Sequence, residues 1–149
     1  MIRTGFILAF IIALFFIQSA NAQDYKSALG VRLSSSNPEI NNSISFKYFL
    51  GQKVAAEALL SFGNPVGLGL LLEKHNELGV SALKWFYGAG PFFGFGGQRN
   101  VGAQGVLGLD YKIPTIPFNL SIDWKPELSL AKEFSFEPAA IGLSARFTF

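Results

Sequence analysis

The sequence contains no cysteine, a single histidine and few charged side chains, which make up 15% of its residues. Without cysteine the chain forms no disulfide scaffold, and it offers no reactive thiol, no Cys-ligated zinc and no lipoprotein anchor. Helix-length runs with apolar residues spaced i, i+3, i+4 are also missing. These absences favour a β protein, as do the sixteen glycines and the 15% share of aromatic residues.

One uninterrupted apolar run is present, from Gly5 to Ile17, and it is thirteen residues long. Arg3 precedes it, and a small-residue A-x-A pattern follows at Ala20 to Ala22. Because thirteen residues are too few to span a bilayer comfortably, the pattern predicts a secretory signal peptide, residues 1–22, rather than an anchor. The mature chain, residues 23–149, is then one domain.

Charge of either sign is scarce in the mature chain, which holds eleven basic and ten acidic side chains and has a formal charge of +1. This balance predicts no electrostatic attraction to nucleic acid. No nucleic-acid partner is therefore expected.

The stretch FNLSIDWKPELSLA, residues 118–131, is apolar at every even position and small or polar at every odd one. A period of two is typical of a β-strand with one apolar face. Comparable alternation recurs between turn-like breakers and predicts eight strands. They are expected near 25–33, 42–50, 53–62, 65–74, 83–96, 101–113, 118–131 and 139–149. The even count and short connections predict an antiparallel up-and-down barrel.

Alternation alone does not say which face lies inside. A soluble barrel turns its apolar set inward around a ligand, whereas a transmembrane barrel turns it outward against lipid. With the amino terminus on the periplasmic side, aromatic residues of the apolar set gather at one rim, as in a membrane-interface girdle. They are Tyr25, Tyr48, Trp85, Tyr87, Tyr111, Phe118, Phe147 and Phe149. The girdle favours lipid outside.

The opposite face carries the charges of the strand interiors, diluted with glycine and serine, in nearly equal numbers of each sign. Its charged members are Arg32, Lys47, Glu57, Glu73, Lys84, Asp110, Lys112, Asp123, Lys125, Glu127 and Arg146. A lumen enclosed by eight strands has room only for side chains, and buried charges there need partners. We therefore expect a mutually paired charge network in the lumen. A solvated outer face of a soluble barrel remains the alternative.

Three segments resemble a family of small, porin-like outer-membrane β-barrels of Gram-negative bacteria. They read LKWFYGAGPFFGFGG, GVLGLDYKIPTIPFNLSIDWKPEL and ARFTF, and they cover roughly the second half of the chain. The resemblance implies an eight-stranded barrel and an outer-membrane location, with no defined activity. The final strand, IGLSARFTF, also resembles the signal by which such barrels are handed to their assembly machinery.

Catalytic chemistry finds little support. His75 falls in EKHNEL, where we expect a solvated periplasmic turn, and GAGPFFGFGG has no following helix to make a phosphate loop. No enzyme activity, cofactor or metal is expected. Pro91 removes a ladder donor from a strand, so a bulge near Gly90–Pro91, or an exit of the strand there, is predicted.

The sequence thus predicts a monomeric outer-membrane barrel with a charge-plugged lumen and a structural or interaction role. Two alternatives stay open. One is a narrow channel for ions or small solutes. The other is a soluble periplasmic barrel that binds an apolar ligand.

Overall fold

The fold is that of a computed structural model, which describes residues 25–35, 40–63, 66–96, 100–131, 134–138 and 140–149. The expected signal peptide, residues 1–22, lies outside the described residues. Within the described segments the regular structure is β-strand, and no helix there is long and apolar enough to cross a membrane.

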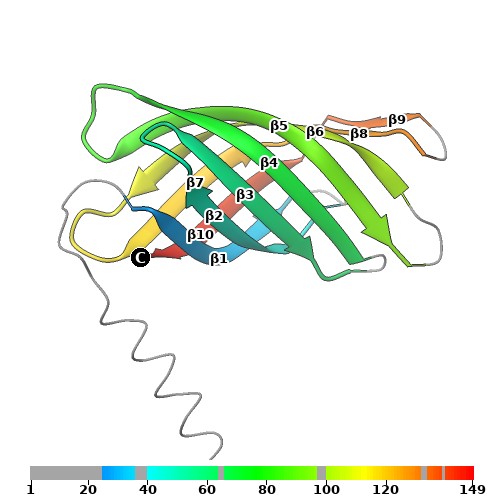
Figure 1. The fold of residues 1–149 in the computed structure, drawn as a ribbon, viewed down its shortest axis with the longest axis horizontal. Coiled ribbons are helices and arrows are strands. Elements are labelled where there is room, and N and C mark those ends of the chain that lie inside the picture. Colours follow the sequence, from blue (N-terminus) through cyan, green and yellow to red (C-terminus); the bar gives the residue numbers. More distant parts are fainter. Residues whose placement is uncertain (1–24, 36–39, 64–65, 97–99, 132–133, 139) are drawn as a thin grey trace, which may run out of the picture.

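Ten strands in the described segments form one sheet (Figure 1). Their bounds are β1 Ser27–Ser34, β2 Ser43–Phe49, β3 Val54–Ser61, β4 Val66–Glu77, β5 Leu83–Phe95, β6 Asn100–Lys112, β7 Phe118–Trp124, β8 Glu127–Ser129, β9 Ser135–Glu137 and β10 Ile141–Thr148.

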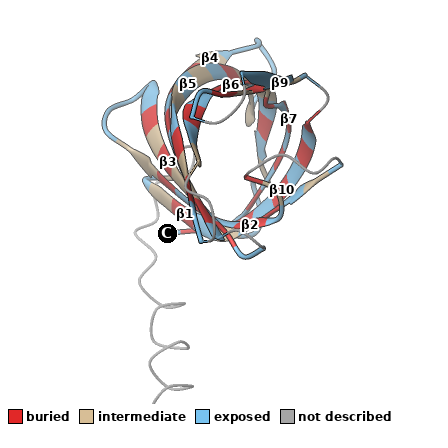
Figure 2. Ribbon diagram, turned by 90° about the vertical axis from the view of Figure 1, so that its right-hand side faces the viewer, coloured by how far each residue is buried: buried red, intermediate tan, exposed pale blue. Residues whose placement is uncertain are grey.

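The sheet closes on itself into a barrel (Figure 2). Each of β1 to β6 pairs antiparallel with the next strand, β7 pairs with β6 and β10, and β10 returns to β1. The ring therefore consists of β1 to β7 and β10, with β8 and β9 added at one end. The predicted all-β, eight-stranded antiparallel barrel is confirmed.

The strand predicted at 118–131 is divided at Lys125 and Pro126 into β7 and β8. Its register with β6 is unchanged across the break, since Leu107 pairs with Trp124 and Gln104 with Glu127. The amide of Gly105 donates to the carbonyl of Pro126 at 3.0 Å and bridges the gap. On its other side, β7 pairs with β10, whereas β8, beyond Pro126, pairs with the short β9. Strand β9 forms within the stretch predicted as a loop between the last two strands.

The barrel wall is not equally tall on all sides. Strands β4, β5 and β6 have 12, 13 and 13 residues, whereas β1, β2 and β3 have 8, 7 and 8. The β8–β9 hairpin pairs with β6 near the start of that strand, at residues 102–104, so it adds to the taller side (Figure 1).

Side chains alternate between a polar inner face and an apolar outer face. In β7 the odd-numbered residues Asn119, Ser121 and Asp123 are buried, whereas Leu120 and Ile122 between them are exposed. The apolar half of each strand thus faces outward. The inner face also holds a small apolar cluster, made up of Ile40, Leu59, Leu71, Phe86, Phe92 and Val106.

Glycine makes room for the aromatic rings of this cluster. Phe86 on β5 points into the lumen and lies opposite Gly108 in the β5–β6 register. A Cβ atom at Gly108 would lie 2.5 Å from the carbonyl oxygen of Ile122 and 2.7 Å from Cζ of Phe86, so a larger residue there would displace both the neighbouring strand and the ring. The inward glycine and the inward phenylalanine therefore depend on each other.

The predicted bulge at Pro91 is wrong. Gly69 pairs with Phe92 and Leu72 with Ala89, so the register of β4 with β5 is the same on both sides of the proline. Pairing with β4 is interrupted only between these two pairs, and the β6 side is regular through Pro91.

A side chain compensates for the interruption. The Nε2 atom of Gln104 donates to the carbonyl oxygens of Leu70 and Pro91 at 3.3 and 3.2 Å. Gln104 is buried in the lumen and supplies a donor where proline has none. A proline is thereby accommodated without a change of register.

This arrangement predicts that Gln104→Met lowers the free energy of unfolding by about 1–3 kcal/mol, because it leaves a buried carbonyl unsatisfied and removes the acceptor of Nζ of Lys125, 3.2 Å away. Urea-dependent unfolding in detergent micelles, followed by tryptophan fluorescence, measures the loss. Pro91→Ala restores a backbone donor, so in that background the same change should cost less. An equal loss in both backgrounds would contradict the role of Gln104 at Leu70.

Candidate functional site

The candidate site is the polar interior of the barrel. Of the eleven charged residues expected in the lumen, nine are buried: Arg32, Lys47, Glu57, Glu73, Asp110, Asp123, Lys125, Glu127 and Arg146. Lys84 and Lys112 are half-buried. Two groups can be distinguished among these nine. The terminal cluster lies near the barrel end where β1 begins and β10 ends, and its charged members are Lys47, Glu57, Glu73, Asp110 and Arg146. The distal cluster lies toward the other end and consists of Arg32, Asp123, Lys125 and Glu127.

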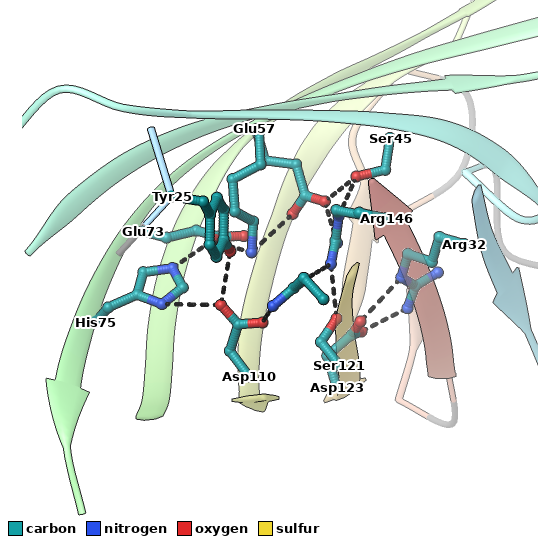
Figure 3. A network of polar contacts seen from close by, with 12 residues as sticks. Tyr25, Arg32, Ser45, Glu57, Glu73, His75, Asp110, Ser121, Asp123 and Arg146 are labelled. Atoms are coloured by element: carbon teal, nitrogen blue, oxygen red, sulfur yellow. Dashed lines mark hydrogen bonds and ion pairs between the residues drawn. The ribbon is translucent and has the colours of Figure 1, made fainter. Parts of the chain in front are cut away.

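Arg146, on β10, is the centre of the terminal cluster (Figure 3). Its Nη2 lies 2.5 Å from Oε1 of Glu57, and its Nε donates to the hydroxyl of Ser45 at 2.7 Å. Its Nη1 donates to Oδ1 of Asn119 at 3.2 Å and to the hydroxyl of Ser121 at 2.8 Å. One guanidinium thus joins strands β2, β3, β7 and β10 across the lumen.

Lys47, on β2, connects two carboxylates of the same cluster. Its Nζ lies 2.8 Å from Glu73 and 3.9 Å from Glu57, and 4.5 Å from the centre of the Phe86 ring. An ammonium over an aromatic face is stabilised by the ring quadrupole. Its charge is therefore met by two anions and one ring.

The prediction that His75 is a solvated turn residue is wrong. Strand β4 continues to Glu77, and this places His75 on the same inward face as Glu73, fully buried. Its Nε2 lies 2.9 Å from Oε2 of Glu73 and its Nδ1 3.6 Å from Oδ2 of Asp110. The imidazole stacks on Phe86 with ring centres 4.9 Å apart. It joins β4 to β6 (Figure 3).

Tyr25, assigned from the sequence to the outer girdle, instead reaches into the lumen. Its hydroxyl donates to Oδ2 of Asp110 at 2.8 Å, and its ring packs edge-on against Phe49 at 5.1 Å. Asn119 donates to the other carboxylate oxygen of Asp110. Tyr25 precedes β1, so the alternation of the strand does not hold its side chain outward. Tyr25 and Phe49 close this end of the lumen.

The distal cluster contains two further ion pairs. Arg32 donates to both carboxylate oxygens of Asp123, at 3.1 and 2.6 Å, in a bidentate pair. Nζ of Lys125 lies 2.5 Å from Oε1 of Glu127. The same oxygen accepts the backbone amide of Ile40 at 3.2 Å, which draws the chain after β1 into the lumen.

Lys112 lies outside both clusters. Its Nζ donates to the carbonyl oxygens of Ile113 and Ile116, at 2.8 and 2.9 Å, and so stabilises the turn between β6 and β7. Lys84 lies opposite Asp110 in the β5–β6 register.

The other girdle residues lie on the outer face, at the end of the barrel that holds the terminal cluster. Phe118 and Phe147 face each other across β7 and β10, with ring centres 5.9 Å apart. Trp85 and Tyr87 stack on β5 at 5.5 Å. Tyr48, Tyr111 and Phe149 complete the set at the ends of β2, β6 and β10.

The polar side chains of the interior are engaged with one another in ion pairs and hydrogen bonds. Ser45 and Ser121 are engaged by Arg146, and His75 contacts carboxylates instead of a hydroxyl. Among the described residues no three His, Cys, Asp or Glu side chains converge as metal ligands do. The side chains fill the lumen and neutralise one another.

Sequence reasoning did not find the inward roles of His75, Phe86, Phe92 or Ile40. His75 follows Glu73 by two residues and so shares its face, a signal that the turn-like letters around it obscured. Phe86 and Phe92 likewise share the parity of inward glycines on β5. Ile40 comes from a connection, where no period predicts orientation.

No protein-family model matches the chain. No curated protein matches it either.

Loss of one partner of a buried pair should be costly. Arg146→Met leaves Glu57 buried without its closest cation and should lower the free energy of unfolding by about 3–5 kcal/mol. The double variant Arg146→Met/Glu57→Gln removes both charges and should recover much of that loss. Urea unfolding in detergent micelles measures both. A double variant as unstable as the single one would contradict the pairing.

Proposed function

We propose that this chain is an outer-membrane β-barrel whose lumen is plugged by its own charges, with a structural or interaction role and no catalysis. The observation that carries the proposal is the division of side chains between the two faces of the closed sheet. Leucine, isoleucine, valine and phenylalanine are exposed outside along the strands, while the charges of the strand interiors are buried inside.

Such an outer surface fits lipid better than water. A soluble monomer rarely exposes a contiguous apolar patch larger than a few hundred Å². Here the belt of exposed apolar residues passes around β1, β7 and β10, for example Val31, Leu120 and Leu143, and continues on the other strands. A soluble barrel that holds an apolar ligand needs the reverse orientation, with apolar side chains inside.

The remaining parts of the proposal come from the ends of the chain. A cleaved signal peptide at residues 1–22 would take the chain across the inner membrane. The last strand, β10, presents Leu143 and Phe147 on its outer side, and Phe149 follows directly after it, which suits recognition by the outer-membrane assembly machinery. The barrel is proposed to act as a monomer.

A narrow channel is the second candidate, and one feature favours it. Nη1 of Arg32 and the hydroxyls of Ser43 and Ser144 are buried without a hydrogen-bond partner in the part of the chain that the structure describes. Arg32 on β1 pairs in register with Ser43 on β2 and with Ser144 on β10, so the three residues lie at one level of the lumen. Water at this level would be one step of a polar path.

Spin labels test the lipid assignment, and the absence of native cysteine makes the labelling specific. Labels at Leu120→Cys and Leu143→Cys should be accessible to oxygen and shielded from a water-soluble nickel chelate in lipid vesicles. Ser144→Cys, the inward neighbour of Leu143, is the control and should be shielded from both. Labels at 120 and 143 that respond to the chelate rather than oxygen would refute the membrane assignment.

Planar-bilayer recording separates the plug from the channel. The wild-type barrel should show no steady openings, because paired side chains fill its lumen. Phe92→Ala/Lys125→Ala removes two of the largest fully buried side chains and should produce brief openings. Steady wild-type openings that Lys125→Ala abolishes would instead establish the channel.

A further inference from the structure

Charges outside the two lumen clusters are distributed unevenly. At the barrel end where β1 begins and β10 ends, the described residues include five lysines and one acid, namely Lys26, Lys53, Lys74, Lys84, Lys112 and Glu77. Three of the lysines, at positions 26, 53 and 74, are exposed. This end therefore presents a basic rim to its surroundings.

The three exposed lysines lie on one arc of the rim. Lys26 immediately precedes β1, Lys53 immediately precedes β3, and Lys74 lies near the end of β4. Lys53 and Lys74 are neighbours, since Val54 pairs with Lys74 and the carbonyl of Lys53 accepts the amide of His75 at 2.7 Å. The positive charges of Lys53 and Lys74 thus lie at the ends of two adjoining strands, β3 and β4, and Lys26 lies at the start of β1.

Two tyrosines lie among these lysines on the rim. Nζ of Lys26 lies 5.6 Å from the centre of the Tyr48 ring on β2, and Tyr87 on β5 pairs in register with Lys74. From β1 to β5 the rim therefore carries a Lys–Tyr arc, composed of Lys26, Tyr48, Lys53, Lys74 and Tyr87.

The apolar belt adjoins this arc directly. Lys74 shares its outward face with Leu72 and Leu70, both exposed, and Val54 lies beside it on β3. A lysine in such a position extends its stem along the apolar surface and places its ammonium at the boundary with water. The arc thus sits where phosphate groups meet acyl chains in a bilayer.

We propose that the Lys–Tyr arc binds the phosphate headgroups of anionic phospholipids. Ammonium groups supply charge, phenol hydroxyls supply donors, and the adjoining leucines supply contacts for acyl chains. An acidic polysaccharide would satisfy the charges but not the apolar surface beside them. This inference rests on the proposed placement of the barrel in a membrane.

The two tryptophans of the chain allow a test at both ends of the barrel. Trp85 lies beside the arc, stacked on Tyr87, whereas Trp124 lies on the outer face at the far end of β7. The barrel is folded into phosphatidylcholine vesicles as two single-tryptophan variants, Trp124→Phe and Trp85→Phe. A fixed fraction of dibrominated phosphatidylglycerol or dibrominated phosphatidylcholine is then included as the quencher.

Brominated phosphatidylglycerol should associate with the Trp85 site about thirtyfold more strongly than brominated phosphatidylcholine, from two lysines acting at the membrane surface. The preference should decrease at high salt. It should be lost in Lys26→Gln/Lys53→Gln/Lys74→Gln and retained in the matched triple arginine variant. Trp124 should show no preference.

Each contrary result has a definite meaning. Equal quenching of Trp85 by both lipids, or an equal preference at Trp124, would overturn the headgroup site and leave the membrane barrel standing. Co-sedimentation with insoluble peptidoglycan, without a lipid preference at Trp85, would assign the arc to a polysaccharide and overturn the proposal. Quenching of neither tryptophan by either lipid would overturn the membrane barrel as well.

Discussion

The pairing of β1 with β10 closes the sheet, and the other features of the molecule depend on this closure. In a ring of eight strands the lumen is only wide enough for side chains, so inward residues away from the barrel ends become buried whatever their chemistry. Arg146, Lys47 and Lys125 are each no more than 1% exposed. A charge in that position is tolerated only with partners, and the partners come from across the ring.

These cross-lumen pairs also define the register of the barrel. Arg32 and Asp123 are 91 residues apart, and Arg146 and Glu57 are 89 apart, so each pair joins distant parts of the chain. A slip of one residue in any strand would turn its charges outward and its leucines inward. The interactions that select the fold are the same ones that fill the lumen, and this is why a structural role is the proposal that best fits the interior.

Strict alternation made the strands predictable, and the stretch at 118–131 keeps one register with β6 even through Pro126. Local pattern was insufficient wherever orientation is decided by distant partners. Tyr25 turns inward because Asp110, 85 residues away, accepts its hydroxyl, and His75 belongs to β4 because Phe86 and Glu73 hold it there. Which cation meets which anion depends on the shape of the closed ring, which no strand contains by itself.

The unequal walls of the barrel have a consequence for its surroundings. A strand of 8 residues, such as β1, and one of 13, such as β5, rise about 20 Å and about 33 Å along the barrel axis at the usual strand tilt. If the barrel spans a membrane as proposed, lipid must match both heights around a single rigid body. In the proposed membrane setting, the bilayer beside the short strands β1–β3 would therefore have to be thinner than the bilayer beside β5, so the barrel would act as a local wedge on bilayer thickness.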